Sequence, residues 1–530
     1  MEEPIPEIGS RAAKMFYSLS AGRLVNVFIT LVLFIYVANK LTAADFGIYT
    51  FAFGFGSLIV AAFSAFGVSH YFNKFLTDHV DRKDFEQMLR TLSNGYTLVT
   101  AVAVLLLLLG FALSQYAATY MLKQPYASAA IMLASVATFF FVIKTTSETA
   151  LVGFGRGDLS AIALMVTAIA QLAASVVLIQ MGHGVMGAVY GMLIGYAIGF
   201  LMGIYYVLKS VSVYGKFRLV MPTREEMRKT LSFSAPIGFN NLLNTGANNF
   251  SILYIGAYVT NSMLGSYGIA VKGLAFMIVF YSAMSMTMIQ AFTSARSSSK
   301  DGKVHSLYNR IINYSLLLTL PIFVFVGVFA KPELFLVLTS KYAYAPIFLT
   351  LIAFGVAINS IGLYLSGLLI ANERTGKILK YAFVSMIFQI AFLLALVPNG
   401  GFLGAAGPVL GGIIAIFIIG SIVDDAMFII GVKRVLGLSL EYRKLIGIFA
   451  SNAMLALILY ICLNLVSGYV AELAAGVAVT LLAYPILATK LGTMDMSDIE
   501  ALRRATGKIR LLSWPVGMFL DYSSIFASRK

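Results

Sequence analysis

The amino-acid sequence predicts an all-α protein that crosses a membrane many times. Hydrophobic residues make up 59% of the 530 residues and charged residues only 12%, whereas a soluble domain carries about 25% charged residues. Apolar runs close to the length of a bilayer-spanning helix, about 20 residues, recur from Phe16 to Thr489 with short polar breaks between them. The fold class is therefore a polytopic α-helical membrane protein.

These apolar runs predict about 14 spans in three groups. The first six are expected at residues 16–39, 46–73, 92–114, 127–153, 158–180 and 184–208. The next six are expected at residues 231–257, 263–292, 311–330, 344–371, 377–397 and 404–423. Two additional spans follow near residues 445–467 and 470–489.

The first two groups of spans are two copies of one unit. LTAADFGIY (41–49) returns as VTNSMLGSY (259–267), with Thr, Gly and Tyr repeated 218 positions apart. The same offset relates LVGFGRGD (151–158) to LIANERTG (369–376), and GVMGA (184–188) matches GFLGA (401–405) within one position. Because each copy has an even number of spans, both copies have the same orientation, as in transporters with two lobes related by an axis along the membrane normal.

The repeat divides the chain into five segments. They are an N-terminal lobe (1–208), a cytoplasmic linker (209–230), a C-terminal lobe (231–431), two additional spans (445–489) and a cytoplasmic amphipathic tail (490–530). Thr223 and Glu226 form a capping-box pattern, which predicts a helix start in the linker. Basic and apolar residues alternate in the tail, which fits an interfacial helix as well as a solvated one.

Lys and Arg residues predict which side of the membrane each break faces. The N-terminus, the even-numbered breaks and the C-terminal tail hold 30 of the 38 Lys and Arg residues, and the odd-numbered breaks hold four. Because cytoplasmic loops are enriched in Lys and Arg, we expect both termini in the cytoplasm. This placement explains the net charge of +15 without a nucleic-acid partner.

Ionisable residues inside the predicted spans are the first candidate functional groups, because each costs about 2.5–3.5 kcal/mol at the centre of a membrane helix. Arg23 lies toward the cytoplasmic end of the first span and Lys272 toward the outer end of the eighth. Lys144 and Glu148 share one face of the fourth span. A snorkelling Arg23 and a purely structural Lys144–Glu148 bridge are the alternatives to roles in a central cavity.

Amide side chains form a second group of candidates. The seventh span carries them on largely one helical face, at Asn240, Asn241, Asn244 and Asn248. With the repeat offset, the last three align with Arg23, Asn26 and Thr30 of the first span. Both faces are expected to line the shared cavity, although amides also join helices within membranes.

Motifs for catalysis or metal binding were not found in the sequence. The four histidines are scattered, Cys462 is the single cysteine, and no phosphate-binding loop occurs. We therefore expect a protein that is not an enzyme and needs neither a cofactor nor a metal. Asp424 and Asp425 are expected to cap the end of the twelfth span at the membrane interface.

Four elements of the chain resemble the Wzx-type polysaccharide flippases of the multidrug/oligosaccharidyl-lipid/polysaccharide exporter superfamily. They are Arg23 in the first span, LTAADFGIY at the entry to the second, the GRGD loop (155–158) and the G-x-x-GA element. The resemblance extends over nearly the whole chain. It implies a cell-membrane protein that moves a polyprenyl-diphosphate-linked oligosaccharide to the outer leaflet by alternating access, with a polysaccharide polymerase or glycosyltransferases as partners besides the membrane lipids.

The candidate substrate-binding residues fit this implication, because unpaired cations at several depths would offset the cost of moving an anionic diphosphate through the membrane. These residues are Arg23, Asn26, Lys144, Glu148, Asn241, Asn244, Asn248 and Lys272. In the expected mechanism Arg23 takes the diphosphate from the cytoplasm and Lys272 meets it in the outward-facing state.

Three other functions stay open at this point. A lipid II flippase shares the superfamily, but its first span usually differs from GRLVN (22–26). A cation-coupled multidrug antiporter would need carboxylates inside a lobe, and Glu148 is one such group. A membrane glycosyltransferase or polymerase would need a large outer loop with acids or histidines, whereas every predicted outer break is short.

Overall fold

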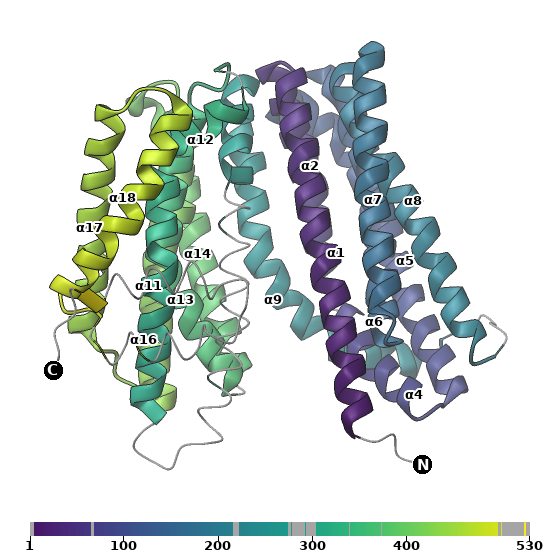
Figure 1. The fold of residues 1–530 in the computed structure, drawn as a ribbon. Helices are drawn as coiled ribbons and strands as arrows, with labels where there is room; N and C mark the ends of the chain where they lie inside the picture. Colours follow the sequence, from purple (N-terminus) through teal and green to yellow (C-terminus); the bar gives the residue numbers. More distant parts are fainter. Residues whose placement is uncertain are drawn as a thin grey trace. The chain divides into compact units, whose positions relative to one another are not determined.

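The computed structural model describes residues 5–64, 68–215, 222–273, 277, 292, 304–338, 340–372, 374–494, 496, 500, 524 and 525. Within these ranges every regular element is a helix (Figure 1). The predicted all-α class is thereby confirmed.

The first repeat contains six long helices, all overlapping the predicted spans. They are α1 (Ile5–Lys40), α2 (Ala43–Ser64), α5 (Phe85–Tyr116), α6 (Ser128–Gly153), α7 (Gly157–Leu178) and α8 (Gly184–Ser212). Short turns of helix connect or extend them: α3 (Val68–Tyr71), η1 (Phe72–Leu76), α4 (Thr77–Asp81), η2 (Ala117–Met121), η3 (Pro125–Ala127) and η4 (Ile179–His183).

The second repeat and the last two spans are also helical. The elements are α9 (Arg224–Gly256), α11 (Val304–Val328), α12 (Ala330–Val337), α13 (Ala345–Ala371), α14 (Thr375–Asn399), η5 (Gly400–Leu403), α15 (Gly407–Ile413), η6 (Ile414–Ile419), α16 (Gly420–Leu436), α17 (Tyr442–Leu465) and α18 (Tyr469–Lys490). Residues 261–273 are helical too, and most of the remaining predicted eighth span lies outside the described residues.

Nine of the described helical stretches are long and apolar enough to cross a membrane. One of them, Gly157–Ser212, contains both α7 and α8, because a π-helical turn joins these two helices. The chain reverses there at Gly182, whose φ of 89° favours glycine. The protein is therefore a multi-pass membrane protein, and the total of fourteen spans stays a prediction.

The helices form two compact units, Met1–Gly265 and Ser266–Lys530. The first unit includes α9, which packs against α2. Its first turns reach the core of this unit, where Met227 and Leu231 pack against buried residues of the neighbouring helices. In the sequence, α9 begins the second repeat. The boundary between the two compact units, at Gly265, therefore differs from the predicted lobe boundaries, and those lobe boundaries stay a prediction.

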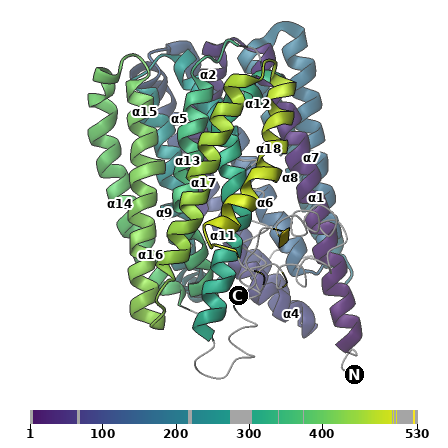
Figure 2. The same ribbon diagram turned by 60° about the vertical axis from the view of Figure 1, so that its left-hand side comes forward.

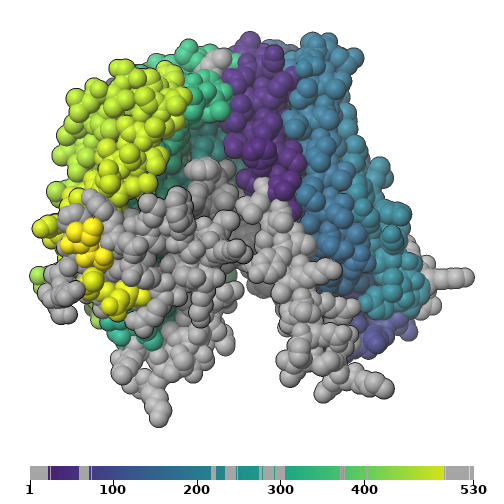
Figure 3. Space-filling view, viewed as in Figure 1, coloured from purple at the N-terminus to yellow at the C-terminus, as the bar shows by residue number. Residues whose placement is uncertain are grey.

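Within each unit the helices pack as long, adjacent rods. In the first unit α7 lies against both α8 and α1, and the described part of α1 runs along α7 in the space-filling view (Figure 3). In the second unit α17 and α18 lie side by side (Figure 2). Small residues allow this close approach, as at Gly22, where an added Cβ would lie 2.6 Å from Cβ of Ala161.

Candidate functional site

Lys144 and Glu148 form an ion pair on α6, one helical turn apart. The distance between Nζ and Oε1 is 2.8 Å, and the two side chains are only 4% and 13% exposed. The sequence placed both residues on one helical face, and the structure brings their charged ends together. Lys144 is therefore not an unpaired cation, which corrects one part of the expected ladder of positive charges.

Helices α7 and α8 pack around the stem of Lys144. A Cβ added at Gly199 of α8 would lie 3.0 Å from Cδ and 3.2 Å from Cε of the lysine, and it would collide with Oγ1 of Thr167 from α7. The ammonium group lies 5.2 Å from the centroid of the Phe141 ring, within the range of cation–π attraction. The glycine at position 199 thus makes room for a buried lysine.

Hydroxyl groups and aromatic rings continue this site toward α5 and α8. The Tyr96 hydroxyl donates to Oγ of Ser147 over 2.8 Å, and Ser147 donates to the carbonyl of Ile143 over 3.0 Å. The rings of Tyr196 and Phe141 lie 4.9 Å apart. The ion pair therefore lies in a largely dry region where electrostatic interactions are stronger than in water.

This arrangement is suited to the exchange of one anion for another. Glu148 neutralises Lys144, so the pair has no net charge. An anionic oxygen of a substrate could replace the carboxylate at Nζ. A break without replacement would leave one charge buried and unpaired, which costs about 3–5 kcal/mol.

Arg23 and Asn26, three residues apart on α1, differ in exposure. Gly22 packs against Ala161 of α7, whereas the neighbouring Arg23 side chain is exposed and Asn26 is half-buried. The ion pairs and hydrogen bonds of the described residues do not connect Arg23 to the Lys144–Glu148 pair. A role for Arg23 therefore stays a prediction.

The remaining sequence candidates lie in α9 and beyond it. Asn241, Asn244 and Asn248 belong to α9, but their side chains lie outside the described residues. Lys272 is half-buried in the helical segment 261–273 and belongs to the second unit. Their predicted cavity roles stay predictions.

Asp424 and Asp425 do not end a helix, so their expected role as caps was wrong, whereas their expected place at the membrane interface stays a prediction. Helix α16 continues to Leu436, and Asp425 is only 8% exposed. Its Oδ1 accepts a hydrogen bond of 2.7 Å from the backbone N–H of Gly362 in α13. The prediction ended the helix at the acidic pair. Apolar residues continue beyond that pair, however, and they indicate a longer helix.

An ion pair that the sequence analysis missed fastens α9 to α5. Arg90 contacts Glu226 over 2.8 Å and Glu86 over 3.2 Å. Glu226 also completes the predicted capping box with Thr223. Hydrogen bonds from the Thr223 backbone and from the Arg90 guanidinium hold the pKa of Glu226 below its ordinary value of 4.5. Pairing over 136 residues of separation left no local sequence signal.

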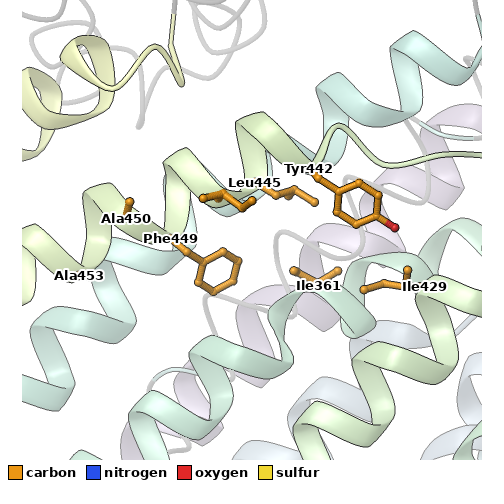
Figure 4. Close-up of a pocket in the computed structure, with 8 residues that line it drawn as sticks. Ile361, Ile429, Tyr442, Leu445, Phe449, Ala450 and Ala453 are labelled. Atoms are coloured by element: carbon orange, nitrogen blue, oxygen red, sulfur yellow. The ribbon is translucent and has the colours of Figure 1, made fainter.

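The second unit contains an apolar groove of about 510 Å³ (Figure 4). Helix α17 supplies most of its lining, and α13 and α16 supply one residue each. The lining residues are Ile361, Ile429, Tyr442, Leu445, Ile446, Phe449, Ala450 and Ala453. Such a groove suits a hydrocarbon chain rather than a sugar, because its lining offers almost no hydrogen-bonding groups.

Among the described residues, no group of three His, Cys, Asp or Glu side chains could hold a metal ion. The site chemistry is therefore that of charges, hydroxyls and aromatic rings. Comparison with known proteins gives the family: the model of a family described as polysaccharide biosynthesis protein matches residues 36–347. The chain belongs to this family. This family agrees with the polysaccharide part of the resemblance noted from the sequence motifs.

A relative of this chain occurs in Haloferax volcanii. It is described as a probable low-salt glycan biosynthesis flippase, Agl15, and is 23% identical over 155 residues. The match covers 29% of this chain and 33% of Agl15. The chain thus matches about a third of the length of this curated relative, and the activity of the whole protein is a matter of proposal.

Two solved structures resemble this chain over most of its length. An inward-facing MATE-family multidrug resistance transporter of the MOP superfamily has a TM-score of 0.66 at 16% identity and covers 80% of this chain and 99% of its own. The lipid II flippase MurJ, in an inward closed conformation, has a TM-score of 0.66 at 14% identity, with 90% and 99% covered. At these identities the likeness concerns the fold.

Proposed function

We propose that the protein is a flippase that moves a lipid-linked oligosaccharide across the cell membrane by alternating access. Its family, the partial match to a glycan biosynthesis flippase and its transporter fold support this proposal. The observation that carries it in the chain itself is the buried Lys144–Glu148 pair. A lysine with a displaceable counter-ion can bind an anionic headgroup without leaving a bare charge inside the membrane.

In this mechanism the diphosphate of the lipid carrier takes the place of Glu148 at Nζ of Lys144. The exposed Arg23 would meet the diphosphate first, and Lys272 would meet it later in the cycle. Hydroxyls and amides near Lys144 and on α9 would bind sugar hydroxyls. The prenyl chain would stay in the hydrocarbon region, and the apolar groove beside α17 suits it. A polymerase or glycosyltransferases acting on the same glycan would be the functional partners.

The test is flipping of a fluorescent lipid-linked oligosaccharide in proteoliposomes. The informative variant is Lys144→Met/Glu148→Gln, because it removes both charges and leaves no charge unpaired. We expect it to insert normally and to lose most of the transport, as should Arg23→Ala and Lys272→Ala. If the charge-free variant transports at the wild-type rate, the pair is structural and the proposed role of Lys144 fails.

A cation-coupled multidrug antiporter is the second candidate function, and the buried acids Glu148 and Asp425 favour it. The same proteoliposomes distinguish the two functions when loaded with a cationic dye under a proton or sodium gradient. Extrusion of the dye without movement of the lipid would replace the flippase proposal. Movement of the lipid without extrusion of the dye would support it. Lipid II, supplied as a separate substrate, tests the third candidate function, that of a lipid II flippase.

A further inference from the structure

The start of α2 packs against the repeat-related start of the helical segment 261–273. A Cβ added at Gly47 would collide with the carbonyl oxygen of Asn261, and a Cβ added at Gly265 would collide with that of Ala43. The repeat offset of 218 positions relates Gly47 to Gly265 and Ala43 to Asn261. The two contacts are therefore reciprocal: each glycine meets the backbone that corresponds to its own upstream neighbour.

The two segments also begin their helices in the same way. Oγ1 of Thr42 accepts a hydrogen bond from the backbone N–H of Asp45 over 3.1 Å. Oγ1 of the repeat-related Thr260 accepts one from Met263 over 3.4 Å. We call residues 42–47 and 260–265 together the paired helix starts. All of these residues belong to the first unit.

The paired helix starts are tightly buried. Phe46 is 1% exposed, and the repeat-related Leu264 is 0% exposed. A Cβ added at Gly256, at the end of α9, would lie 2.9 Å from the Phe51 ring and 3.3 Å from Leu264. Leu264 is therefore inaccessible to a reagent in water as long as the two segments stay together.

Contacts between equivalent residues define a position in the molecule. When two copies of a unit are related by a twofold axis, all contacts between them come in reciprocal pairs, but only residues close to the axis can contact their own equivalents. A Cβ added at Gly265 would lie 3.2 Å from the backbone nitrogen of Gly47, its own equivalent. The paired helix starts therefore lie close to the pseudo-twofold axis of the repeat. The Lys and Arg distribution predicts that they face the outer side, because the break between the first and second spans is an odd-numbered one.

We infer that the paired helix starts are the outer closure of the transport cycle, which separates when the protein opens to the outside. This inference rests on the proposed alternating access. Backbone packing through glycine suits a closure, because small residues let two backbones approach closely without a bond that holds them together. The two copies meet close to the axis, so both must move apart together when an outward path opens.

Cysteine labelling tests this closure without any substrate. In a Cys462→Ser background, Leu264→Cys reports on the buried contact through its reaction with a membrane-impermeant maleimide added outside. Gly47→Ala or Gly265→Ala should each raise the labelling rate about fivefold or more, because a methyl group disfavours the closed contact. Gly376→Ala is the matched control, since an added Cβ there meets nothing within 4 Å, and it should leave the rate unchanged.

A second measurement keeps the glycines intact, in case their substitution prevents folding. Supply of lipid-linked oligosaccharide on the cytoplasmic side should raise labelling of Leu264→Cys in the otherwise unchanged protein. Unchanged labelling in both experiments, with folded protein, would overturn the closure. Raised labelling by Gly47→Ala together with no lipid movement by wild type would instead retain the closure and refute the proposed substrate.

Discussion

Removal of one charge from the Lys144–Glu148 pair should destabilise the protein far more than removal of both. The pair is 2.8 Å apart and the side chains are 4% and 13% exposed, so water screens the interaction little. Lys144→Met leaves Glu148 buried and unpaired, which should lower the free energy of unfolding by about 3–5 kcal/mol. In Lys144→Met/Glu148→Gln we expect most of that loss to be recovered, because replacement of both charges by neutral groups of similar size is often nearly neutral.

The assay is unfolding of the purified protein in mixed micelles with increasing denaturing detergent, followed by helical circular dichroism. Arg82→Gln is a matched control, because Asp78 and Arg82 also form a pair one turn apart, 2.9 Å long, but are 45% and 72% exposed. Exposed pairs contribute about 0–1 kcal/mol, so this variant should unfold almost like wild type. An equal loss in the single and double variants would show that packing, and not charge, determines the effect.

Three further outcomes follow from local geometry. Because the pKa of Glu226 is lowered in the folded protein, its contribution to stability should be present above its ordinary pKa of 4.5 and decline as pH falls below that value. Glu226→Gln should abolish that part of the pH dependence of the free energy of unfolding. Gly362→Ala places a Cβ 2.6 Å from Oδ1 of Asp425 and should cost about 1–3 kcal/mol, measured by the same denaturing titration. Ala453→Trp, which fills the apolar groove from an exposed position, should reduce lipid transport and leave unfolding unchanged; normal transport would exclude the groove as the site of the prenyl chain.

The membrane-spanning helices were predictable from the sequence because a bilayer imposes a simple rule. Every backbone polar group inside it must be hydrogen-bonded within the protein, so apolar runs of sufficient length become helices. The ends of helices were less predictable. Helix α1 begins at Ile5 and α16 extends to Leu436, because a helix can continue past the hydrocarbon core wherever its backbone bonds stay favourable.

The candidate site was predictable only where its residues are close in sequence. Lys144 and Glu148 are four residues apart on one helix, so their pairing follows from the helical repeat. Gly199 and Thr167, which make room for and flank the lysine, come from two other helices. The same holds for Arg90 and Glu226, and for Asp425 with Gly362. No local pattern specifies such partners, because they depend on how the helices are arranged.

The sequence by itself determined the class of the protein, its repeat and its family, because hydropathy, internal similarity and short motifs are properties of the linear chain. Tertiary structure alone decided that the repeated glycines, Gly47 and Gly265, meet each other's upstream backbone. It also decided that Lys144 is neutralised by Glu148 in a dry, aromatic setting. Both results depend on the close approach of helices, and that approach is set by packing between segments that lie far apart along the chain.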